Sequence, residues 1–107
     1  MTNLYSWEIM AKSCKNMSEV RAEIDRVDRL LVPLLLERLE YIKQAGHIKT
    51  DRARVRDNNR VEDVVSKALG TAGAINGNKD YIEDIYRHLI EWSINHEFTV
   101  WDIEHGD

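Results

Sequence analysis

An apolar stripe interrupted by two cations is the main feature of the first half of this chain. Apolar residues recur there at three- and four-residue intervals, the repeat of one helix face. These positions are Val20, Ile24, Val27, Leu31 and Leu34. With about 100° per residue, the same face continues through Arg38, Ile42, Ala45 and Lys49. Because an unpaired cation facing a core is costly, Arg38 and Lys49 are each expected to face an anion.

The length of this stripe predicts one long helix that ends near Lys49. Either Asn16 or Ser18 serves as its N-cap, and Asn16 with Glu19 has the form of a capping box. A helix of about thirty residues spans about 45 Å, more than a compact domain of this size needs. Its apolar face would therefore stay partly bare in a monomer, which predicts dimerisation. Pro33 should kink this helix rather than break it, because the stripe keeps its phase across the proline.

Two shorter helical patterns follow a charged loop over residues 50–59. The first is capped by Asp57 or Asn59 and has one apolar face; its positions are Val61, Val64, Val65, Ala68, Leu69 and Ala72. After an Asn76-Gly77-Asn78 turn, Asp80-x-x-Glu83 opens the last helix. Its stripe contains Ile82, Ile85, Tyr86, Leu89, Ile90, Ser93, Glu97 and Trp101. Residues 1–15 form a leader without clean periodicity, and residues 16–107 form one helical domain.

Composition narrows the class of protein. The 107 residues are 43% hydrophobic and carry a net charge of −4, so a nucleic-acid binder is disfavoured. The single cysteine, Cys14, cannot form an internal disulfide, which fits a reducing compartment. No apolar run approaches the length of a membrane span, and no signal-peptide core is visible. The expectation is a cytoplasmic, all-α domain.

Polar side chains at the ends of two stripes define a candidate site. If the first and last helices pack together, Arg38 and Lys49 meet Ser93 and Glu97 in a polar chamber with excess positive charge. Arg60, in the first turn of the middle helix, could reach it. Such a chamber suits a small dicarboxylate held by arginine. The structural alternatives are that the cations extend to solvent, that Ser93 bonds to its own helix, and that Glu97 pairs with Arg38.

Several motifs together resemble the all-helical class of chorismate mutases over residues 17–101. The matching motifs are Val20-Arg21-x-x-Ile24-Asp25-x-Val27-Asp28, Leu35-x-Glu37-Arg38, Ile48-Lys49, Val55-Arg56-Asp57-x-x-Arg60 and Leu89-Ile90-Glu91-x-Ser93. The resemblance implies a three-helix protomer in an intertwined homodimer, with the long first helices paired. It also implies the rearrangement of chorismate to prephenate, without a metal or organic cofactor.

The resemblance assigns a role to each matched residue. Arg38 would hold one substrate carboxylate, and Arg21 would reach into the partner protomer's site to bind a carboxylate there. Lys49 would donate to the breaking ether oxygen. Three further residues would assist: Ser93 at a carboxylate, Asp57 near the substrate hydroxyl, and Arg60 through its charge.

Three positions depart from the pattern of the family. A glutamate that binds the substrate hydroxyl in many members is replaced by Val61. The usual glutamine donor to the ether oxygen is Glu97, which donates only when protonated. Pro33 is unusual within the long helix.

Val61 also supports an alternative activity, because isochorismate-pyruvate lyases share this fold. The chain resembles those lyases in Arg60-Val61, in Tyr41-Ile42-Lys43, in Ile90-x-Trp92-x-Ile94 with Trp101, and in a cysteine seven residues before Arg21. Asp57 is more typical of the mutases, and mutase is therefore the preferred prediction.

A non-catalytic helical interaction module is the third possibility. Loss of Arg38 or Lys49 would be expected in such a protein, and both are present. The arginines at 52, 54 and 56 are interpreted as a solvated loop or as an electrostatic funnel for a dianion.

Overall fold

The computed structural model describes residues 11–106. They form three α-helices, α2 (Met17–Ile48), α3 (Asn58–Ala74) and α4 (Lys79–His105), with a 3-10 helix η1 (Arg52–Arg54) before α3. The predicted all-α fold is confirmed. Most of the predicted leader, residues 1–10, lies outside the described residues. None of the helices in the described part is long and apolar enough to cross a membrane.

Helix α2 begins where its capping residues predict. The Asn16 side chain accepts a hydrogen bond from the Glu19 backbone N–H, which identifies Asn16 rather than Ser18 as the N-cap. The Glu19 carboxylate accepts in return from the backbone N–H of Lys15 at 2.8 Å. The helix continues through Pro33 without a break, although proline has no N–H to donate.

The other two helices also start at Asx caps. Asp57 rather than Asn59 caps α3 and accepts from the Arg60 N–H. Helix α4 starts earlier than predicted, because the Asn78 side chain caps it by accepting from the Tyr81 N–H. The predicted turn before α4 is present, and Asn76 in it has a positive φ of 56°. The charged stretch predicted as a loop contains η1.

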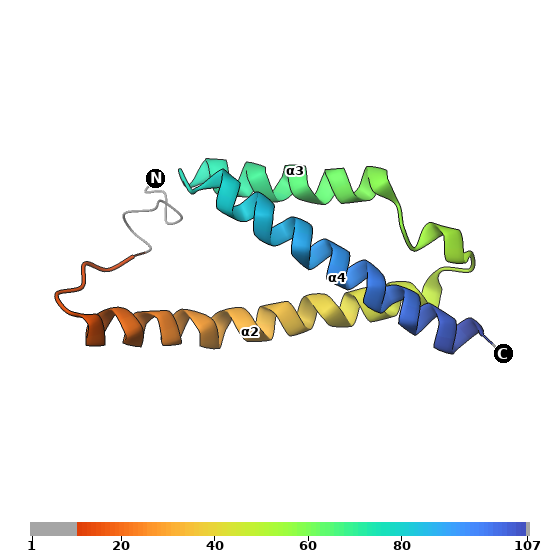
Figure 1. The fold of residues 1–107 in the computed structure, drawn as a ribbon, viewed down its shortest axis with the longest axis horizontal. Helices are drawn as coiled ribbons and strands as arrows, with labels where there is room; N and C mark the ends of the chain where they lie inside the picture. The colour runs from red at the N-terminus through yellow and green to blue at the C-terminus, as the bar shows by residue number, and fades with distance from the viewer. Residues whose placement is uncertain (1–10, 107) are drawn as a thin grey trace, which may run out of the picture.

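Helix α4 is the central element, because it packs against both α2 and α3. Figure 1 shows it running from the end of α3 across to the C-terminal part of α2. The small core lies mainly between α3, α4 and the loop before α3. Its buried members are Val55, Val65, Ile90 and Ile94.

Most of α2 has little packed against it. Of its 32 residues only Gly46 is buried, and stripe residues such as Ile24 and Leu34 are 52% and 62% exposed. The radius of gyration is 17.5 Å, against about 13 Å for a compact chain of this length. The bare apolar face that the sequence predicted is therefore present on α2.

Gly46 lies where α2 packs closely against α4. A Cβ at this position would lie 3.0 Å from Val100 Cγ1 and 3.2 Å from the backbone oxygen of Glu97. Glycine therefore allows the two backbones to approach closely, only three residues before Lys49.

We expect Gly46→Ala to destabilise the protein. Alanine gains up to about 1 kcal/mol in helix propensity, but overpacking at a helix contact costs about 1–3 kcal/mol. Gly70→Ala in α3 is the matched control, because a Cβ there meets nothing within 4 Å, and it should be stabilising. Chemical denaturation measures both changes. Equal stabilisation by the two substitutions would show that the approach at Gly46 imposes no constraint.

Candidate active site

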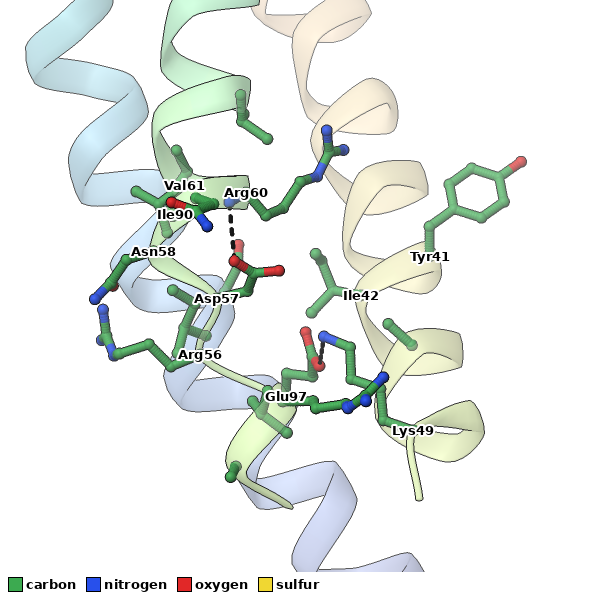
Figure 2. Close-up of a pocket in the computed structure, with 18 of the residues that line it drawn as sticks. Tyr41, Ile42, Lys49, Arg56, Asp57, Asn58, Arg60, Val61, Ile90 and Glu97 are labelled. Atoms are coloured by element: carbon green, nitrogen blue, oxygen red, sulfur yellow. Dashed lines mark hydrogen bonds and ion pairs between the residues drawn. The ribbon is translucent and has the colours of Figure 1, made fainter. Parts of the chain in front are cut away.

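The C-terminal part of α2, the following loop, the start of α3 and the middle of α4 enclose a cleft of about 880 Å³ (Figure 2). Six of the seven site residues predicted from the sequence line it: Arg38, Lys49, Asp57, Arg60, Ser93 and Glu97. The lining contains five lysine or arginine side chains and two carboxylates, an excess of three positive charges. The cleft is therefore suited electrostatically to a small anion.

Lys49 and Glu97 form the ion pair at the base of the site. Lys49 Nζ donates to Glu97 Oε2 at 2.6 Å, and both side chains are shown in Figure 2. Glu97 is only 4% exposed, whereas the Lys49 side chain remains 31% exposed. A buried carboxylate needs such a partner because its desolvation is expensive. The ammonium also keeps a face toward the cleft.

Arg38 and Ser93 make the second polar contact between α2 and α4. Arg38 Nη1 donates to Ser93 Oγ at 3.0 Å, and Ser93 Oγ donates to the Leu89 carbonyl oxygen at 2.7 Å. Ser93 thus bonds to its own helix and also accepts from the guanidinium. The alternative in which Glu97 pairs with Arg38 is wrong, because Lys49 takes that place. Arg38 keeps further donors for a ligand.

The start of α3 contributes both signs of charge. The Asp57 carboxylate caps the helix by accepting from the Arg60 N–H at 3.1 Å. The Arg60 guanidinium bonds Asp63 at 2.6 Å, and in Figure 2 it lies away from the Lys49–Glu97 pair. Hydrogen bonds from Lys67 and Arg60 lower the pKa of Asp63 below its ordinary value. Arg60 is therefore partly neutralised.

Two arginines attach the loop before α3 to α4. Arg52 binds Asp102 at 2.8 and 3.2 Å, and Arg56 binds Glu91 at 3.0 and 2.6 Å. These hydrogen bonds lower the pKa of both carboxyl groups. Because pairing lowers these pKa values, Glu91 and Asp102 stay ionised to a lower pH than free carboxyl groups do. The pairs therefore support the loop above the ordinary carboxyl pKa and release it as the pH falls through the lowered pKa values.

Arg54 differs from its two neighbours in this loop. It lines the cleft and takes part in no ion pair among the described residues. The alternate spacing of Arg52, Arg54 and Arg56 is the only sign of Arg54 in the sequence, and it predicts an electrostatic funnel or a solvated loop rather than a site residue. The cleft is also lined by Arg56 and by apolar side chains that were not predicted as site residues, including Ile42, Ala45 and Val55.

Arg21 does not lie at this cleft. It is exposed in the second turn of α2, and seventeen residues of helix separate it from Arg38 by roughly 25 Å. Its predicted role in the site of a partner protomer is not tested by a single chain. Val61, the departure from the family pattern, does line the cleft.

The arrangement is suited to binding and electrostatic stabilisation. It offers three cations with free hydrogen-bonding capacity, Arg38, Lys49 and Arg54, together with a hydroxyl and two carboxylates in a partly apolar cleft. Among residues 11–106, no three His, Cys, Asp or Glu side chains are grouped so that they could hold a metal ion. Cys14 is a free thiol outside the cleft lining.

Comparison with known proteins defines the class. Residues 20–98 match the family described as chorismate mutase type II. The chain therefore belongs to the type II chorismate mutase family, a class of chorismate-mutase-like enzymes. It is also similar to the isochorismate pyruvate lyase of Pseudomonas aeruginosa, with 24% identity over 90 residues that cover 84% of this chain and 89% of the lyase. The predicted family is confirmed. The family is described as a chorismate mutase and the similar protein as an isochorismate pyruvate lyase, so the two matches name different activities.

Proposed function

We propose that this protein is a cytoplasmic chorismate mutase that rearranges chorismate to prephenate in aromatic amino-acid biosynthesis. The observation that carries the proposal is the cleft in which Arg38 and Lys49 face Ser93 and Glu97. In the family resemblance these four residues stand at the positions that bind the substrate carboxylates or donate to the ether oxygen. The family match over residues 20–98 supports the same conclusion.

The proposed chemistry needs no covalent intermediate. The rearrangement is concerted, so the protein acts by holding a compact substrate conformation and stabilising charge on the breaking ether oxygen. Arg38 binds a carboxylate with assistance from Ser93, and Lys49 donates to the ether oxygen. Asp57 lies on the side of the substrate hydroxyl, and Arg60 adds positive charge to that end of the cleft.

Isochorismate-pyruvate lyase activity is the second candidate. It is supported by the similarity to the Pseudomonas aeruginosa lyase and by Val61, which replaces the hydroxyl-binding glutamate of many mutases. Both substrates are dianions of similar shape, so Arg38 and Lys49 suit either one. We prefer the mutase because Asp57 matches the pattern of that activity.

Separate incubation with chorismate and isochorismate tests the proposal. We expect prephenate from chorismate; salicylate with pyruvate from isochorismate would instead support the lyase. Formation of neither product would favour a non-catalytic interaction module.

Lys49→Ala should then lower kcat by about a hundredfold or more, because it removes stabilisation made in the transition state. Lys43→Ala is the matched control, since Lys43 is an exposed lysine of the same helix outside the cleft. Circular dichroism checks that both variants are folded. Near-normal turnover by the Lys49 variant would remove it from the proposed mechanism.

Glu97 makes turnover depend on protonation in this proposal. Its carboxyl group can donate to the ether oxygen only when protonated, so activity should fall as the pH rises. Glu97→Gln supplies a permanent amide donor and should flatten the pH profile of kcat. Glu83→Gln, near the other end of α4, should leave the profile unchanged. An unaltered profile in the Glu97 variant would exclude this residue from the donor role.

A homodimer is part of the same proposal. The bare apolar face of α2 supports a homodimer, because many large apolar side chains are exposed along this one helix. Contiguous exposed apolar surface of this kind marks an interaction site. Arg21 in the first turns of α2 would then supply a cation to the cleft of the partner protomer.

Mixing two inactive variants tests the shared site. After subunit exchange, Arg21→Ala with Lys49→Ala should recover about a quarter of wild-type activity, since half of the dimers are mixed and each has one intact site. Mixing Arg38→Ala with Lys49→Ala should recover nothing, because both residues belong to one protomer's site. Absence of recovery in the first mixture would mean that Arg21 does not act across the interface.

A further inference from the structure

The last two turns of α4 contain Trp101, which binds the backbone of Lys49. Trp101 Nε1 donates to the Lys49 carbonyl oxygen at 2.9 Å, in a contact between residues 52 positions apart. The Lys49 N–H donates to the Ala45 carbonyl at the end of α2. Both backbone polar groups of Lys49 are therefore engaged, and its ammonium is held by Glu97, one helical turn before Trp101 on α4.

We propose that Trp101 is a positioning residue, whose indole N–H fixes the Lys49 backbone so that the ammonium points into the cleft. This inference rests on the proposed function and extends it to a residue outside the cleft lining. Lys49 is the C-cap of α2, where the chain leaves the helix with φ −63° and ψ 132°. A carbonyl at a helix end has no partner within the helix, so an external donor, here the Trp101 indole, can hold the backbone from which the Lys49 side chain extends.

The other contacts near the end of α2 are less suited than the Trp101 bond to orienting the Lys49 side chain. His47 pairs with Glu104 at 3.1 Å, and Arg52 binds Asp102 while lying over the Phe98 ring at 4.6 Å. Exposed polar contacts of this kind are weak, and the Arg52–Asp102 ion pair is also screened by salt. The Trp101 bond is half-buried, and its donor is a rigid ring packed against the core.

A purely structural explanation competes with this proposal. The carbonyl of Lys49, the C-cap of α2, lacks a partner within the helix, and a structural role for Trp101 would be only to satisfy it. The two explanations differ in kinetics, because a positioning role acts only through the Lys49 ammonium. If Trp101 had only a structural role, its substitution would also weaken substrate binding, and it would lower activity further in a Lys49→Ala variant.

Helix α4 provides a matched control for the test. Trp92 and Trp101 each stack on the histidine four residues later, with ring centroids 5.2 Å and 4.4 Å apart. Only Trp101 donates from its ring nitrogen to Lys49. Trp101 also packs against the core, whereas Trp92 is 58% exposed. Substitution of either tryptophan by phenylalanine removes an indole stacked on a histidine, and benzothienylalanine at position 101 separates loss of the bond to Lys49 from loss of packing, because it keeps the ring size and lacks the N–H.

We expect Trp101→Phe to lower kcat by about tenfold or more, as small misplacements of a catalytic group do, with KM nearly unchanged. Trp92→Phe should leave both constants near wild type. In a Lys49→Ala background, Trp101→Phe should cause no further loss. Equal effects of the two phenylalanine variants, or an undiminished effect without the Lys49 ammonium, would overturn the proposal.

A second measurement does not depend on turnover. In NMR spectra the Trp101 indole N–H should exchange with solvent more slowly than that of Trp92, and the Lys49 carbonyl signal should move in Trp101→Phe only. If the protein converts neither substrate, these signals still test the contact while the proposed function fails. If phenylalanine unfolds the chain, benzothienylalanine at position 101 keeps the ring size and lacks the N–H. Rapid exchange at Trp101 would contradict the contact itself.

Discussion

The ion pair between Lys49 and Glu97 is the interaction on which the arrangement of the site depends. Glu97 is nearly inaccessible, so without a cation its charge would be strongly unfavourable. At 2.6 Å the ammonium meets this need. Lys49 comes from the end of α2 and Glu97 from the middle of α4, so the pair can form only where these helices cross. Gly46 allows that crossing by leaving room for Val100 and the Glu97 backbone. The position of the charge pair and the packing of the helices therefore constrain each other.

This constraint explains why an otherwise poorly packed helix ends in an ordered site. Helix α2 has no buried residue over its first two thirds, and its contact with α4 lies in its C-terminal part (Figure 1). There the Arg38–Ser93 bond, the Gly46 approach, the Lys49–Glu97 pair and the Trp101 bond succeed one another along the two helices. The core between α3 and α4 supports α4 from its other side. The exposed apolar face over most of α2 therefore does not disturb the contacts between α2 and α4 that form the cleft.

Local patterns in the sequence predicted the helices and most of the site. The phase of the α2 stripe placed Arg38 and Lys49 on the side of α4, and the α4 stripe placed Ser93 and Glu97 opposite them, because helical periodicity determines which residues share a face. The Asn16 and Asp57 caps follow from side chains that reach a nearby N–H. The partner of Glu97 and the bonds of Arg52, Arg56 and Trp101 were not predicted. They join residues far apart in sequence, and their geometry depends on how two helices cross, which a single periodic pattern does not contain.

The choice of glutamate at position 97 has a chemical consequence under the proposed function. An ionised Glu97 attracts the Lys49 ammonium and competes with a substrate oxygen for its protons. A neutral glutamine, usual at this position in the family, would leave the ammonium free and also offer an amide donor. With glutamate, a proton on the carboxyl group weakens the pair and supplies the second donor at the same time. The pairing that makes burial of Glu97 possible is therefore also the pairing with which a substrate oxygen must compete for the Lys49 ammonium.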